Sequence, residues 1–229
     1  MLKFNLIAAL AAMTFSLSAQ ASAQDGSDFQ AWSAVILTAR PAESSRLLLW
    51  FDGHARFGND ASDLGVSILR PGVGWRVSDN LDLWTGYARI VSRAGDAPEI
   101  EEDRLWQQAT YPVTDILGGK LSGRTRLEQR FRETGADTGW RLRQFARWER
   151  RFAGSPFSVL LADELFINVN DADWGQRAGF DQNRLFIGGA LRLSKQARFE
   201  AGYLNNILNL AGPDDRTNHN LFFQLLVNL

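Results

Sequence analysis

The chain has 229 residues, of which 45% are hydrophobic, and its formal net charge is −1 at pH 7. A chain this close to neutrality carries no overall basic charge for binding nucleic acid. Cysteine is absent, which excludes disulfides, thiolate nucleophiles and cysteine metal sites. The composition therefore excludes several kinds of chemistry, and it implies no cofactor.

The first residues have the pattern of a secretory signal peptide. Lys3 is followed by an apolar run from Leu6 to Leu17 and then by the small residues Ala21, Ser22 and Ala23. An uncleaved anchor helix is the alternative, but the apolar run is shorter than the roughly 20 residues that a bilayer span needs. The pattern predicts a cleaved signal over residues 1–23 and a mature single domain over residues 24–229, exported from a Gram-negative cytoplasm.

Beyond the signal, apolar and polar residues alternate with a period of two, which predicts an all-β protein. The predicted strands are Phe29 to Thr38, Arg46 to Gly58, Leu64 to Val77, Leu81 to Val91, Asp103 to Thr114, Lys120 to Glu133, Trp140 to Phe152, Phe157 to Asn168, Asn183 to Leu193, Arg198 to Asn209 and His219 to Leu229.

Most of these segments are longer than the five or six residues that are usual in soluble domains, and a tilted strand needs about nine to eleven residues to cross a bilayer. Long and short connections also alternate, from the long Leu210 to Asn218 and the short Ser194 to Ala197 backwards. The pattern predicts an antiparallel transmembrane β-barrel of 10–12 strands in the bacterial outer membrane, with short periplasmic turns and longer external loops. Because both termini of such a barrel face the periplasm, we expect an even number, ten or twelve. A soluble periplasmic β-sandwich is the alternative.

The last segment has the clearest dyad pattern. Polar Asn220, Gln224 and Asn228 lie between apolar residues that occupy every second position back from the C-terminus: Leu221, Phe223, Leu225, Val227 and Leu229. Such a strand resembles the one by which the barrel-assembly machinery recognises its clients, although the usual final residue is aromatic. We expect this strand to face outer-membrane lipid and to bind that machinery.

In two neighbouring segments the charged residues gather on one set of alternate positions. Of the 25 basic residues 22 are Arg, whose planar guanidinium pairs with carboxylates in crowded interiors better than Lys does. A solvated surface is the ordinary explanation of such ladders. We instead predict a charged network that faces the lumen, formed by Arg124, Arg126, Glu128, Arg130, Arg132, Arg141, Arg143, Arg147, Glu149, Glu164, Arg184, Arg192, Arg198 and Glu200.

Four stretches together resemble the family called domain of unknown function 2490. They are Arg124–Arg130, Asp163–Asn168, Gly179–Arg184 and the pair Gly202-Tyr203. The resemblance covers nearly all of the chain after Trp32. It implies an outer-membrane barrel and supplies neither a substrate nor a catalytic residue.

Three functions remain open. The first is a narrow porin-like channel whose arginine-rich lumen would favour small anionic or polar solutes. The second is a closed structural barrel that binds a partner or lipid, its lumen blocked by ion pairs. The third is a lipid-modifying enzyme that uses His219 with Asp214, Asp215 and a serine from another strand. No convincing catalytic constellation is present, however, and His54 and His219 form no metal-binding pair. We therefore expect neither an enzyme nor a metal site.

Overall fold

The computed structural model describes residues 28–209 and 216–229. The predicted signal peptide at 1–23 and the candidate acids Asp214 and Asp215 lie outside these ranges. In the described parts of the chain, no helix is long and apolar enough to cross a membrane.

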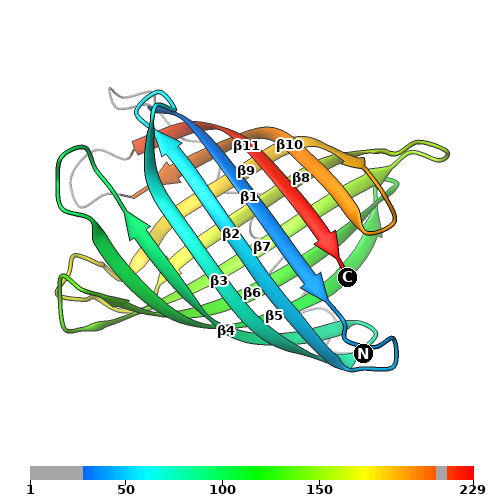
Figure 1. Cartoon of the computed structure of the whole chain (residues 1–229), viewed down its shortest axis with the longest axis horizontal. Helices are drawn as coiled ribbons and strands as arrows, with labels where there is room; N and C mark the ends of the chain where they lie inside the picture. Colours follow the sequence, from blue (N-terminus) through cyan, green and yellow to red (C-terminus); the bar gives the residue numbers. More distant parts are fainter. Residues whose placement is uncertain (1–27, 210–215) are drawn as a thin grey trace.

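The described residues form eleven strands that close into a barrel (Figure 1). The strands are β1 (Asp28–Ala39), β2 (Leu47–Gly58), β3 (Asp63–Ser78), β4 (Leu81–Ser92), β5 (Ile100–Ile116), β6 (Gly119–Arg132), β7 (Thr138–Arg151), β8 (Phe157–Asn168), β9 (Gly179–Arg192), β10 (Ala197–Leu208) and β11 (Arg216–Asn228). The all-β prediction is confirmed, and each predicted segment corresponds to one strand. The largest differences lie at the starts of β5, β9 and β11, which begin three or four residues earlier than predicted.

Consecutive strands pair antiparallel around the wall, and the barrel closes between β1 and β11. These two strands pair in parallel over eleven residues, from Asp28 opposite Asn218 to Thr38 opposite Asn228. The blue and red arrows therefore run side by side in the same direction in Figure 1. Every strand has a neighbour on both sides, so no edge is left unpaired.

The expectation of an even strand number and a wholly antiparallel sheet is wrong. A parallel ladder satisfies backbone N–H and C=O groups as an antiparallel one does, so an odd number of strands also closes. The consequence is that Asp28 and Leu229 lie at opposite ends of the barrel.

The two ends differ in their connections. We call the end that contains residues 40–46, 79–80, 117–118, 152–156 and 193–196 the short-turn end, and the end that contains residues 59–62, 93–99, 133–137, 169–178 and 209–215 the long-loop end. From β3 onward no connection at the short-turn end is longer than its neighbours at the long-loop end, as expected, although residues 133–137 and 152–156 are equal in length. The expected alternation fails earlier in the chain, where residues 40–46 at the short-turn end outnumber residues 59–62 opposite them.

Side chains alternate between the interior and the outer face of the wall. Two apolar clusters lie inside. One contains Trp84 and Trp106 on β4 and β5, and the other contains Trp32 and Phe186 on β1 and β9. Charged side chains fill the space between them, because an eleven-stranded wall is too wide for apolar residues alone to fill.

Glycines let the interior aromatic rings lie flat on the wall. The Trp106 ring is fully buried against Gly72 and Gly86, where an added Cβ atom would come within 2.5 Å of the ring at either position. At Gly86 the added atom would also lie 2.3 Å from the carbonyl oxygen of Pro71. The rigid backbone and the packed indole leave no room for a methyl group there.

We predict that Gly86→Ala destabilises the barrel by about 1–3 kcal/mol through overpacking. The matched control is Gly53→Ala on β2, where the nearest atom to an added Cβ is 3.8 Å away. Urea unfolding followed by the migration of folded and unfolded bands on a gel measures both variants. Equal stability of the two would show that the Trp106 contact does not constrain position 86.

Candidate functional site

The centre of the barrel is an ion-pair network built around Glu128 on β6. Its carboxylate lies 2.7 Å from Arg141 Nη2 and 2.7 Å from Arg143 Nη1, and Arg104 and Arg126 approach at 3.6 and 3.9 Å. Glu128 is 1% exposed. Four arginines from three strands thus surround one buried carboxylate.

The other interior glutamates are shared in the same way. Glu164 binds Arg124 and Arg143 at 2.6 and 2.7 Å. Glu102 binds Arg104 and Arg130, and Glu200 binds Arg147 and Arg198. Each of these carboxylates pairs with at least two guanidinium groups. Positive charges therefore outnumber negative charges in this part of the interior.

Most of the residues predicted for the charged network meet in these contacts. Eleven of the fourteen take part in ion pairs: Arg124, Arg126, Glu128, Arg130, Arg141, Arg143, Arg147, Glu149, Glu164, Arg198 and Glu200. The other three do not pair with a described carboxylate. Arg132 lies near the Trp174 ring, Arg184 contacts Trp32 and Phe166, and Arg192 is exposed at the short-turn end.

Several interior residues were missed by sequence reasoning. On β2, Asp52 binds Arg70 at 2.8 Å and His54 at 3.2 Å, and Arg56 follows on the same face. Their spacing of two residues could have predicted that these three side chains share one face of the strand. On β5 the predicted strand began too late, which left Glu102 in a loop and hid its alternation with Arg104.

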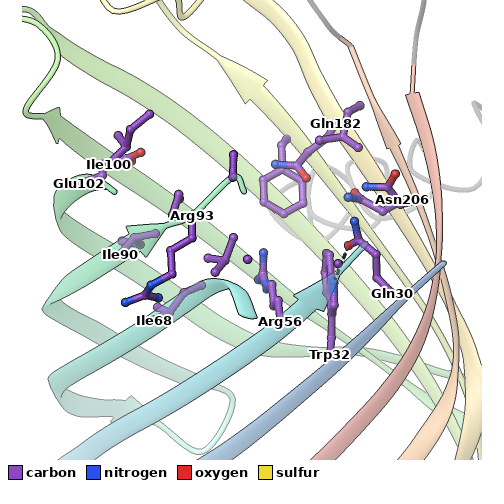
Figure 2. Close-up of a pocket in the computed structure, with 18 of the residues that line it drawn as sticks. Gln30, Trp32, Arg56, Ile68, Ile90, Arg93, Ile100, Glu102, Gln182 and Asn206 are labelled. Atoms are coloured by element: carbon purple, nitrogen blue, oxygen red, sulfur yellow. Dashed lines mark hydrogen bonds between the residues drawn. The ribbon is translucent and has the colours of Figure 1, made fainter. Parts of the chain in front are cut away.

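A cavity of about 770 Å³ occupies the interior at the long-loop end (Figure 2). Nine arginines and four carboxylates line it. Figure 2 shows Arg56 and Trp32 together at its inner part, and the Trp32 indole donates to Gln30 Oε1 at 2.8 Å. A second cavity of about 240 Å³ lies deeper. The two cavities share Trp32, Arg56, Arg70, Arg143 and Arg184, so this basic layer separates them.

Two loops are joined above the cavity at the long-loop end. Asp173 accepts hydrogen bonds from the backbone N–H groups of Ala136 and Asp137, and Asp137 accepts one from the backbone of Asp173. The backbone donors hold the pKa of the Asp173 carboxyl below its ordinary value. Trp174 in the same loop lies over Arg130, with 4.9 Å from the guanidinium carbon to the ring centre. These contacts therefore tie residues 133–137 to residues 169–178 at the long-loop end.

The sequence model of the family described as protein of unknown function (DUF2490) matches residues 29–218. The chain belongs to the DUF2490 family. It is also similar to an uncharacterized protein of Methylorubrum extorquens, with 36% identity over 213 residues that cover 91% of each chain. The predicted family membership is confirmed.

The stretches that carried the resemblance to DUF2490 lie on β6, β8, β9 and β10. Glu128, Glu164 and Arg184 from three of these strands belong to the charged interior. Asp163, beside Glu164, instead lies on the outer face, where its carboxylate is 1% exposed and accepts a hydrogen bond from Asn183. One short motif therefore contributes to both faces of the wall.

The residues considered for catalysis or metal binding are separated. His219 on β11 contacts Tyr203 on the outer face, whereas His54 lies inside. Within residues 28–209 and 216–229, no group of three histidine or acidic side chains could hold a metal ion.

We predict that Glu128→Gln destabilises the barrel by about 3–5 kcal/mol, because it leaves four buried guanidinium groups without their shared counter-charge. The control is Glu99→Gln, which removes the exposed partner of Arg93 and should cost about 1 kcal/mol or less. Urea unfolding midpoints measure both. A similar, small loss in the two variants would contradict a structural role for the buried network.

Proposed function

We propose that the protein is an outer-membrane β-barrel whose lumen is closed by the ion-pair network and which binds solutes from the long-loop end. The observation that carries the proposal is an inverted distribution of polarity. All eleven strands carry exposed large hydrophobic side chains, whereas charged side chains such as Arg126, Glu128 and Glu200 are 1% exposed inside. A water-soluble protein buries apolar residues and exposes charges, so this inversion supports a hydrocarbon environment around the wall.

The strands are also long enough for this environment. They contain 12 to 17 residues, and about nine to eleven are needed to cross a bilayer at the usual tilt. The closed sheet leaves no unpaired backbone edge, as hydrocarbon requires.

Two groups of polar side chains on the outer face hydrogen-bond to one another. Gln107 and Gln129 exchange two hydrogen bonds, at 2.9 and 3.2 Å. Thr125 donates to Gln144 at 2.7 Å, and Gln144 donates to the Tyr111 hydroxyl at 3.2 Å. Hydrogen bonds of this kind lower the cost of placing polar groups against lipid.

We predict that Val35→Arg, on the outer face near the middle of β1, costs about 2–4 kcal/mol for folding into vesicles, whereas Val77→Arg near the end of β3 costs about 0–1 kcal/mol. The two valines are 42% and 43% exposed, which makes them a matched pair. In a soluble protein both would be ordinary surface substitutions with effects of about 0.5 kcal/mol or less. Equal, small effects, together with recovery of the chain in the soluble periplasmic fraction, would overturn the membrane proposal.

A second candidate is the anion-selective channel. The excess of guanidinium groups, and the position of the two cavities on either side of one basic layer, favour it.

Planar bilayers distinguish the two candidates. Because the ion pairs occupy the middle of the lumen, we predict that the wild-type protein leaves the bilayer electrically silent. Conductance steps with anion preference, altered by Arg126→Glu or Arg130→Glu, would contradict closure and support the channel instead.

A further inference from the structure

Two arginines at the inner part of the large cavity have no described carboxylate within ion-pair distance. They are Arg56 on β2 and Arg184 on β9, and both line the cavity. Arg184 donates hydrogen bonds to Asn206 and Gln182. Glu164 is the source of negative charge that acts on it most strongly. Both arginines lie against one aromatic ring, with 4.1 and 5.0 Å from their guanidinium carbons to the Trp32 ring centre. Arg56 also makes no side-chain hydrogen bond within the described residues, and its Nε atom is buried without an acceptor.

The carboxylates of the cavity are already committed to other partners. Asp181 binds Arg141 at 3.0 Å, and Glu102 binds Arg130 at 2.7 Å. Asp28 accepts hydrogen bonds from the backbone of Asn59 and Asp60 in the turn after β2. Asp63 accepts a hydrogen bond from the Asn59 side chain in the same turn. None of these four carboxylates lies within ion-pair distance of Arg56 or Arg184.

The surroundings of Arg56 make its charge costly. The charged groups that act on it most strongly are four further arginines: Arg184, Arg70, Arg143 and Arg104. An unpaired buried charge among like charges destabilises a fold, and a stacked tryptophan offsets only part of that cost. A structural role alone does not explain this arrangement, whereas an anion in the cavity would neutralise it.

We infer that the cavity at the long-loop end is a binding site for a free, phosphate-bearing solute, whose phosphate group lies at Arg56 and Arg184 beside Trp32. Two guanidinium groups match the charge of a phosphate dianion, and their planar N–H pairs suit its oxygens. The cavity volume of about 770 Å³ accommodates a small organic phosphate. The inference rests on the proposed function only for the side of the membrane from which the solute enters.

A lipid headgroup is a second source of phosphate, and the geometry disfavours it. The site lies inside a closed wall of eleven strands. A headgroup bound there would pull its acyl chains into a polar cavity and away from hydrocarbon, which is unfavourable for every methylene group. Inorganic phosphate and glycerol phosphate should therefore bind better than a short-chain phosphatidic acid.

The test is isothermal titration calorimetry on the full-length protein in a neutral, phosphate-free detergent. Inorganic phosphate is titrated at constant ionic strength, with chloride as the blank. We expect saturable binding that Arg56→Gln and Arg184→Gln each weaken by about tenfold or more. The matched control is Arg192→Gln, which removes one arginine at the short-turn end, outside this cavity, and should leave the affinity unchanged.

Stability measurements separate binding from a structural role. Without phosphate, Arg56→Gln should unfold at a higher urea concentration than wild type, because it removes an uncompensated charge, and phosphate should no longer stabilise it. No binding by the wild type, or equal weakening by Arg192→Gln, would overturn the site. Tighter binding of phosphatidic acid than of inorganic phosphate would overturn the free-solute assignment. All these measurements are made in detergent, so their failure is distinguishable from failure of the membrane proposal.

Discussion

The pairing of β1 with β11 is the constraint on which the rest of the structure depends. It leaves each strand with two partners and separates an interior from an outer face along the whole wall. Without it, the sheet would expose two edges, and the long arginine side chains would face bulk solvent. Closure of the sheet therefore removes these side chains from water. This desolvation strengthens the ion pairs of the charged network and makes an unpaired arginine costly.

The closed wall also explains why the interior is rich in arginine. An eleven-stranded barrel leaves more space than apolar side chains reach across, and a guanidinium group on a long stem spans it. Each such arginine can then contact a carboxylate and an aromatic ring at the same time. Arg126 interacts with Glu128 and lies over the Trp106 ring, and Arg143 binds Glu164 while it lies over Phe166. Lysine lacks the planar group that makes both contacts possible.

The barrel interior contains fewer carboxylates than arginines, and the consequence differs between two layers along the barrel axis. Around Glu128 the arginines share buried glutamates, and these side chains occupy the middle of the barrel. At the layer of Arg56 and Arg184 neither arginine forms an ion pair with a described carboxylate, because Glu164 there pairs with Arg124 and Arg143, and the cavity reaches the long-loop end. Asp173 and Asp137 tie two of the loops at that end to one another. The same chemistry thus supports closure in one layer and an anion site in the next.

The sequence by itself determined the strands, the shared face of the charges on β6 and the family, because a period of two residues is a local property of an extended chain. The ladder from Arg124 to Arg132 and the alternation around Leu221 and Phe223 needed no knowledge of the partner strands. Tertiary structure alone decided the parity of the barrel, since closure depends on the two strands farthest apart in sequence. It also decided which arginines are paired: Arg147 meets Glu200 across 53 residues, whereas Arg56 and Arg184 lie against Trp32 with no described carboxylate at ion-pair distance. Such pairings depend on strand register and barrel width, which no local pattern contains.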